Sequence, residues 1–171
     1  PIFRFLKSAA ETGLKTALVT LTAVTGASTR NPGAHMAVAE DGSFSGSFSG
    51  GCVEAAVVSE ALDVINSGKP REIRLGAGSP YLDIRLPCGG GIDLLFTPIL
   101  SDAVISDIFD RIESREPFTI ILDSESTDIR CMAQIANKVA VERAGTEFLV
   151  HHLPAARVVI LGHGPSVESL V

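Results

Sequence analysis

The chain has no tryptophan, only one tyrosine and no long apolar run, and each absence narrows the class of protein. Aromatic residues make up 5% of the chain and hydrophobic residues 46%, so the core must consist mainly of aliphatic side chains. No apolar segment approaches the ~20 residues that a membrane-spanning helix requires. The sequence therefore indicates a packed globular protein, and excludes a disordered or membrane-spanning one.

The chain also lacks any cluster of lysine and arginine. Its 14 basic and 20 acidic residues give a net charge of -6, which argues against a nucleic-acid partner. The first residues do not show the pattern of a secretory signal peptide. Cys52, Cys88 and Cys131 lie too far apart to indicate a disulfide framework or a closely spaced zinc site. We therefore expect a cytoplasmic protein with reduced thiols and no membrane association.

Hydrophobic periodicity predicts an α/β fold, with a mixed sheet and flanking helices. Helices are expected over residues 1–11, 52–66 and 101–113, and the second of these is expected to turn Glu54 outward. Strands are expected over residues 16–25, 34–39, 43–48, 71–75, 81–86, 92–99, 118–122, 129–135 and 147–152.

The periodicity divides the chain into a first domain, residues 1–153, and a short second part, residues 154–171. Pro154-Ala155-Ala156 has the composition of a linker. An apolar strand follows and runs into Gly162-His163-Gly164, which is how a Rossmann-like, dinucleotide-binding domain begins. We expect the chain to be a piece of a longer protein, and this late strand, which lacks a partner, to be exchanged between the subunits of a homodimer.

Two glycine-rich elements each place a thiol beside backbone that a ligand can approach closely. The first contains Gly50, Gly51 and Cys52, followed by Glu54, and the second contains Cys88, Gly89 and Gly90. A helix that starts at Cys52 would direct free N–H groups and its positive dipole end at the ligand, which favours an anion. The two elements are interpreted as two halves of one site.

Each of these residues has a plain structural alternative. Cys52 could be a small buried residue, and the glycines around Cys88 could simply connect two strands. Arg30, on a loop that suits a phosphate or carboxylate, could be a solvated side chain. Cys131 lies in an apolar strand and is interpreted as structural, as are the histidines at positions 35, 151 and 152, which have no acid or cysteine at ligand spacing.

Several motifs, in this order, resemble the xanthine dehydrogenase accessory protein (XdhC/CoxI) family. They are Gly-Ala-Ser-Thr-Arg-Asn-Pro-Gly-Ala-His-Met from Gly26, Asp-Gly-Ser from Asp41, Gly-Gly-Cys-Val-Glu from Gly50, Leu-Pro-Cys-Gly-Gly from Leu86, and Val-Val-Ile-Leu-Gly-His-Gly-Pro from Val158. The resemblance covers nearly the whole chain. It implies an N-terminal domain that carries the cysteine motifs, followed by a Rossmann-like domain.

The resemblance implies a maturation factor that binds the molybdenum cofactor without turnover of its own. Such a protein holds the cofactor while a cysteine desulfurase supplies sulfur, and delivers it to apo xanthine dehydrogenase or a related molybdenum hydroxylase. Cys52 would contact the molybdenum as a metal ligand or shield it, beside Gly50, Gly51 and Glu54. Cys88, Gly89 and Gly90 would form the facing wall, and Arg30 would meet the phosphate. The alternative is an oxidoreductase that binds NAD(P) in the following domain and uses Cys52 as a redox or catalytic thiol.

Overall fold

The computed structural model describes residues 1–79, 86, 89–133 and 139–156. Strands β1 (Thr16–Thr25), β2 (His35–Ala39), β3 (Phe44–Ser45), β4 (Arg71–Gly76) and β5 (Gly91–Ile99) form sheet A, in the order β3-β2-β1-β5-β4. All pairings in this sheet are antiparallel. The longest strand pair joins β1 to β5, which lie about seventy residues apart in sequence.

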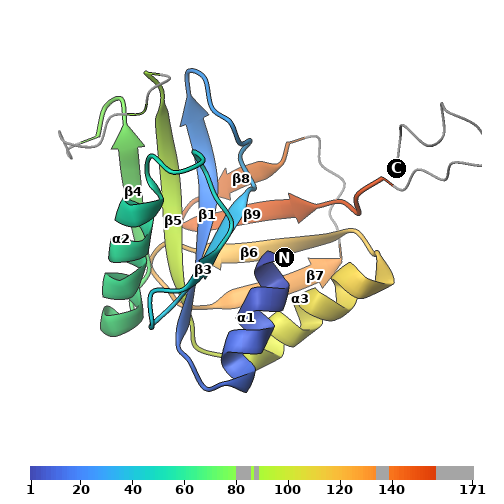
Figure 1. Ribbon diagram of the computed structural model, residues 1–171. Coiled ribbons are helices and arrows are strands. Elements are labelled where there is room, and N and C mark those ends of the chain that lie inside the picture. The colour runs from blue at the N-terminus through green and yellow to red at the C-terminus, as the bar shows by residue number, and fades with distance from the viewer. Residues whose placement is uncertain (80–85, 87–88, 134–138, 157–171) are drawn as a thin grey trace, which may run out of the picture.

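A second sheet, sheet B, contains β6 (Phe118–Asp123), β7 (Ile129–Ala133), β8 (Val141–Ala144) and β9 (Glu147–His152), in the order β7-β6-β9-β8. Its pairings are also antiparallel, and its strands run crosswise to those of sheet A (Figure 1). The expected α/β fold with flanking helices is confirmed, but the expected mixed sheet is wrong, because the described strands form two antiparallel sheets. Periodicity marks the strands, but it does not say which strands pair over long distances.

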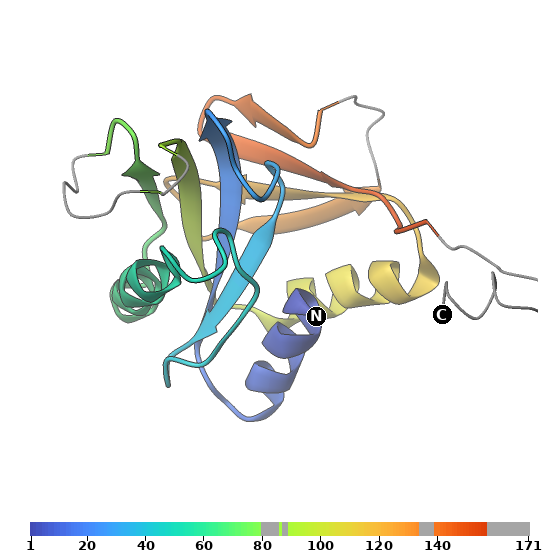
Figure 2. The same ribbon diagram turned by 45° about the horizontal axis from the view of Figure 1, so that its top comes forward.

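Sheet A is buried on both faces, which explains why six consecutive residues of β1 are buried. One face packs against α2 (Glu54–Ser67), through Val57, Ala61 and Val64 of the helix. The other face packs against α1 (Ile2–Glu11), α3 (Asp102–Ser114) and sheet B. Figure 2 shows α2 on one side of the sheet and the other two helices on the opposite side. A two-sided core makes sheet A a rigid base for the loops at its ends.

The predicted elements match most of the observed ones to within one or two residues, and three differences stand out. The strand expected over 43–48 is reduced to β3, and α2 begins at Glu54 instead of Cys52. Strand β8 was not predicted, because its sequence Val-Glu-Arg-Ala is mostly polar and exposed. The strand expected over 81–86 and the end of the one over 129–135 lie outside the described residues. Among the described helices, none is long and apolar enough to span a membrane.

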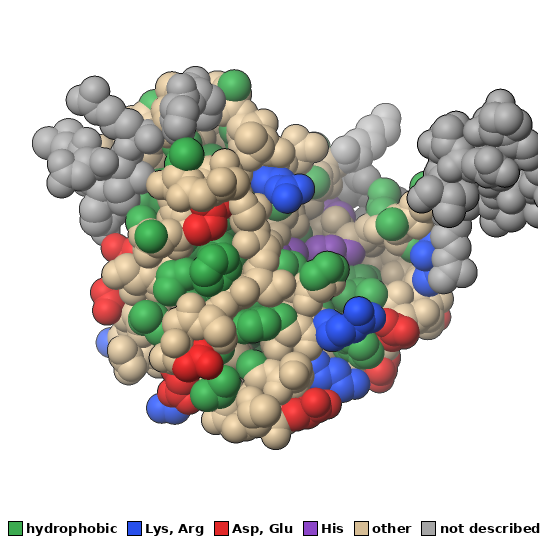
Figure 3. Space-filling view, in the orientation of Figure 1, with side chains coloured by type: hydrophobic (Ala, Val, Ile, Leu, Met, Phe, Trp, Pro, Cys, Tyr) green, Lys and Arg blue, Asp and Glu red, His purple; other side chains and the backbone are tan. Residues whose placement is uncertain are grey.

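The two sheets meet at a stack of aromatic rings that contains two histidines. His35 of β2 and His152 of β9 stack at 5.1 Å between ring centroids, and their Nε2 atoms lie 3.1 Å apart. Phe118 stacks on the far side of His152, and Phe3 of α1 meets both histidines edge-on. Part of the histidine cluster is visible at the molecular surface (Figure 3). A nitrogen-to-nitrogen hydrogen bond of this kind requires one imidazole to donate and the other to accept, so the two rings cannot both be protonated to imidazolium.

We predict that the fold loses stability as the pH falls from about 6.5 towards 4. Burial, and to a smaller extent His152, holds the pKa of His35 well below its usual range, while burial lowers the pKa of His152 to about 4. The unfolded chain therefore binds more protons than the folded chain in this range, so acid favours unfolding. The free energy of unfolding, measured by chemical denaturation at several pH values, should fall by about 1.4 kcal/mol per pH unit for each such histidine.

The variant His152→Gln removes one titrating group and should make this dependence shallower. At pH 7.5 both imidazoles are neutral in the wild type, so that pH gives the reference for the substitution itself. Equal slopes in the variant and the wild type would contradict the assignment.

Candidate functional site

A pocket lies at the end of sheet A where β1 and β5 give way to loops. Its volume is about 130 Å³, and it is lined by Ala27, Ser28, Thr29, Phe48, Ser49, Cys52, Leu86 and Ile92. The lining comes from three segments that are far apart in sequence. The structure therefore brings Cys52 together with the loop after β1 and with both flanks of the Cys88 segment, although Cys88 itself lies outside the described residues.

The close packing of Gly90 joins two of these segments. A Cβ atom at Gly90 would lie 2.7 Å from the carbonyl oxygens of both Thr25 and Ala27. These distances are shorter than real Cβ contacts, so only glycine fits at this place. The missing side chain of Gly90 thus makes room for the chain's own backbone, and the residue is buried. By contrast, Gly89 is exposed, and no residue that the structure describes lies within 4 Å of its Cβ position.

The loop before α2 is organised by the carboxylate of Glu54, which is only 7% exposed. Oε1 accepts hydrogen bonds at 2.8 Å from the N–H groups of Phe48 and Ser49 and from the Ser47 hydroxyl. Oε2 accepts from the Gly51 N–H, the Ser49 hydroxyl and the Val53 N–H, at 2.7, 2.8 and 3.3 Å. The expectation that Glu54 faces outward is therefore wrong. Helical periodicity placed Glu54 on the polar face of the helix. The preceding loop folds back over the first turn of α2 and buries the side chain.

Two serines extend the same network to the remaining N–H groups. Ser47 Oγ accepts from the Gly50 N–H at 2.9 Å. Ser49 Oγ accepts from the N–H groups of Cys52 and Val53 at 2.9 and 3.1 Å. Because both serines donate their own protons to Glu54, all six N–H groups from residue 48 to 53 end on this carboxylate, directly or through one hydroxyl. Sequence reasoning missed this role, since the spacing of Ser49 and Glu54 is not that of a capping box.

This network changes the expected nature of the site. The N–H groups of Gly50, Gly51 and Cys52 were expected to meet an anionic ligand, and the structure shows that they already donate within the chain. The two glycines instead permit the loop's shape, with φ values of +76° and +129°. Among the described residues, nothing lies within 4 Å of a Cβ at either position, which leaves their surface open to a ligand on this side.

Burial would raise the pKa of Glu54, but the hydrogen bonds from Ser49, Ser47 and Phe48 outweigh it and hold the pKa far below its usual range. The group is therefore an anion at neutral pH. A carboxylate offers about four lone-pair positions. With three donors on each oxygen, Glu54 has no acceptor capacity left for a ligand.

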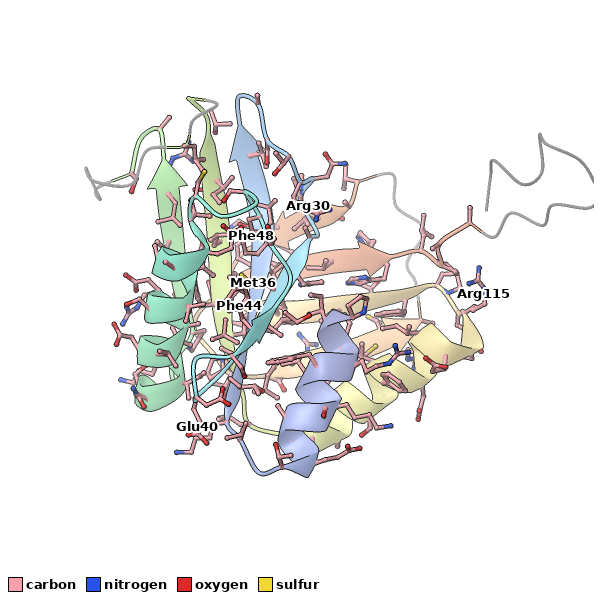
Figure 4. The ribbon with its side chains drawn as sticks, in the orientation of Figure 1. Arg30, Met36, Glu40, Phe44, Phe48 and Arg115 are labelled. Carbon is pink, nitrogen blue, oxygen red and sulfur yellow. The ribbon has the colours of Figure 1, made fainter. Side chains whose placement is uncertain are left out.

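Arg30 supplies positive charge beside the pocket. Its Nε donates to the Ser47 carbonyl at 3.2 Å, and the neighbouring Thr29 hydroxyl donates to the Phe48 carbonyl at 2.7 Å. These bonds tie the loop after β1 to the loop before α2, and Figure 4 shows Arg30 and Phe48 at the same end of sheet A. Among the described arginines, only Arg30 and Arg115 have no carboxylate partner. Both Nη groups of Arg30 thus remain available to an anion.

The two described cysteines differ in their surroundings. Cys52 is exposed and lines the pocket, whereas Cys131 lies half-buried in β7. Burial, helped by Asp107, raises the pKa of Cys131 to about 11. No group of three or more potential ligands that could hold a metal occurs among the described residues. The Gly162-His163-Gly164 motif lies outside them and stays a prediction.

Three comparisons relate the chain to known proteins. The model of the XdhC and CoxI family matches residues 9–76, a range that contains Arg30, Cys52 and Glu54. The molybdenum cofactor insertion chaperone PaoD of Escherichia coli (strain K12) is 44% identical over 131 residues, which are 77% of this chain and 41% of PaoD. The chain thus spans about two fifths of the length of this relative.

A crystal structure from Bacillus halodurans, described as a xanthine dehydrogenase, matches with a TM-score of 0.66 and 20% sequence identity. The match covers 89% of this chain and 52% of that one. At this identity the likeness establishes the fold alone.

We predict that Gly90→Ala destabilises the protein more than Gly89→Ala. The added methyl group at position 90 must displace backbone carbonyls, which typically costs about 1–3 kcal/mol. The matched substitution at position 89 meets no neighbour in the described part of the chain, and its cost of about 1 kcal/mol comes from the left-handed backbone conformation (φ +69°). Chemical denaturation measures both free energies of unfolding. An equal or smaller loss at position 90 would show that this packing is not required.

We predict that Cys52 is alkylated by iodoacetamide far faster than Cys131 in the folded protein. The thiolate is the reactive form, and a thiol with a pKa of about 11 is ionised in only about one molecule in a thousand at pH 8. Peptide mapping by mass spectrometry follows each cysteine separately. In denaturant the difference should vanish, and a Cys131 that reacts as fast as Cys52 before unfolding would refute the assignment.

Proposed function

The chain belongs to the XdhC and CoxI family, and we propose that it binds the molybdenum cofactor for insertion into an apo molybdenum enzyme. The observation that carries this proposal is a pocket lined by the exposed thiol of Cys52, with the guanidinium of Arg30, which has no carboxylate partner among the described residues, beside it. The similarity to PaoD, which is named as a molybdenum cofactor insertion chaperone, supports the molybdenum cofactor as the ligand. The chain covers 41% of PaoD, so further residues can contribute to the complete activity.

The chemistry of the pocket suits one end of this cofactor. A molybdenum atom bound by the sulfurs of a pterin is a partner for a soft thiolate ligand, which Cys52 would provide. Phe48, Leu86 and Ile92 would shield that end from water. Arg30 would pair with the terminal phosphate, to which a guanidinium can donate two parallel hydrogen bonds. The pocket is smaller than the roughly 300 Å³ of a complete small-molecule site, so the rest of the ligand lies beyond it.

We propose a carrier that holds the cofactor without turnover of its own. The open surface of Gly50 and Gly51 would receive the ligand, while the facing wall would include Gly89 and the thiol of Cys88. The partners of such a carrier are a cysteine desulfurase, which supplies sulfur to the held cofactor, and apo xanthine dehydrogenase or a related hydroxylase, which receives it. We expect the carrier to act as a homodimer, which the mass of the complete gene product in solution would test.

We predict that the complete gene product, purified from molybdenum-replete cells, retains molybdenum and pterin in equal amounts. Cys52→Ala should reduce retention by about tenfold or more, because it removes the soft ligand. Arg30→Ala should reduce it by about tenfold to a hundredfold, which corresponds to the loss of a charge-assisted hydrogen bond. Molybdenum is measured by mass spectrometry and the pterin by fluorescence after oxidation.

The chain offers matched controls for both substitutions. Cys131→Ala removes a thiol in sheet B, and Arg115→Ala removes the other described arginine without a carboxylate partner. Both control variants should retain the cofactor as the wild type does. Failure of the wild type to retain any cofactor, or equal retention in all variants, would overturn the proposal.

A further inference from the structure

We propose that Glu54 is a positioning residue, an internal anion that gives the 47–53 loop its shape and thereby sets Cys52 at the pocket. In this role its carboxylate contacts the loop and not the cofactor. The inference rests on the proposed function only where cofactor retention is the readout, because the loop and the thiol can be observed without any ligand.

The geometry of the loop requires a negative charge at this place. Six successive N–H groups, from Phe48 to Val53, converge on Glu54 directly or through the hydroxyls of Ser47 and Ser49. Such a convergence of N–H dipoles forms a nest, a concave arrangement of backbone N–H groups that binds anions. In many proteins a bound phosphate fills a nest, but here the side chain of the following helix does so.

Charge, and not only shape, is needed at this position. A glutamine has nearly the same shape as Glu54, but its amide presents N–H donors where one carboxylate oxygen now accepts three hydrogen bonds. Donors would then face the Gly51 N–H and the Ser49 hydroxyl. An aspartate keeps the charge but is one methylene too short to reach both ends of the loop. The structure thus demands a full-length carboxylate.

Cys52 depends on this arrangement through its neighbours. Its N–H donates to Ser49 Oγ, and Ser49 is itself held by Glu54 through both its N–H and its hydroxyl. Gly51 on one side and Val53 on the other also donate to the carboxylate. If the charge is lost, the backbone that carries the thiol loses these restraints together, while the core face of α2, through Val57 and Ala61, remains packed.

The test compares amide hydrogen exchange of residues 48–53 in the wild type, Glu54→Ala and Glu54→Gln, using the complete gene product without cofactor. Exchange of this loop should accelerate about tenfold to a hundredfold in both variants, as expected when buried donors lose their acceptor. Asp63→Asn is the charge-matched control, because Asp63 is exposed on the same helix, and it should leave the loop's exchange unchanged.

Chemical rescue separates positioning from general destabilisation. Glu54→Ala leaves space for a small carboxylate, so added formate should restore the loop's protection and the wild-type rate of Cys52 alkylation, while chloride at equal ionic strength should not. Unchanged exchange in the variants, or equal effects of formate and chloride, would overturn the inference. If Glu54→Ala fails to fold, Glu54→Gln decides alone, and intact protection of its loop refutes the proposal.

Cofactor retention distinguishes the two proposals. If the wild type retains the cofactor, Glu54→Ala should lose it and regain it in formate, and loss without regain would count against positioning. If the wild type retains none, the proposed function fails, while hydrogen exchange and alkylation still decide the role of Glu54.

Discussion

The pocket at the end of sheet A depends on one interaction, the convergence of the 47–53 loop on the carboxylate of Glu54. Burying a charge costs several kcal/mol unless hydrogen bonds replace its hydration. Here six donors surround the carboxylate, and without it the N–H groups of Phe48, Ser49 and Gly51 would lose their acceptor. Neither partner is stable alone, so the loop and the first turn of α2 form one unit. Because the loop and the carboxylate stabilise each other, Glu54 is buried although it lies on the polar face of α2.

Sheet A gives this unit a fixed base. Both faces of the sheet are covered, by α2 on one side and by α1, α3 and sheet B on the other, so its central strands cannot shift independently. At the end of β1 the chain passes so close to Gly90 that no side chain fits between them. Arg30 and Thr29 then hold the backbone of Ser47 and Phe48. Three segments that are distant in sequence thus reach the pocket from one rigid sheet.

The sequence predicts the elements well where burial and periodicity agree. β1 and α2 are examples, because a continuous apolar run and a helical stripe leave few alternatives. It does not predict that β5 inserts between β1 and β4, since strand order depends on long-range pairing. It also misplaces Glu54, because a polar residue beside a buried stripe is normally solvated. The histidine pair is invisible for a similar reason: His35 and His152 are 117 residues apart and meet only because two sheets pack together.

The internal anion also limits how tightly this pocket can hold its cargo. In many phosphate sites a loop and a helix start donate their N–H groups to the ligand. In this chain those groups are occupied by Glu54 and Ser49, so the charged group left for an anion is Arg30, on the loop beside the pocket. One charge-assisted contact contributes about 1.5–3 kcal/mol, far less than a full nest of donors. Under the proposed function this is an advantage. A carrier must release the cofactor to another protein. Because the N–H donors of this site bind its own loop, the loop keeps its shape while the ligand is bound weakly enough to be released.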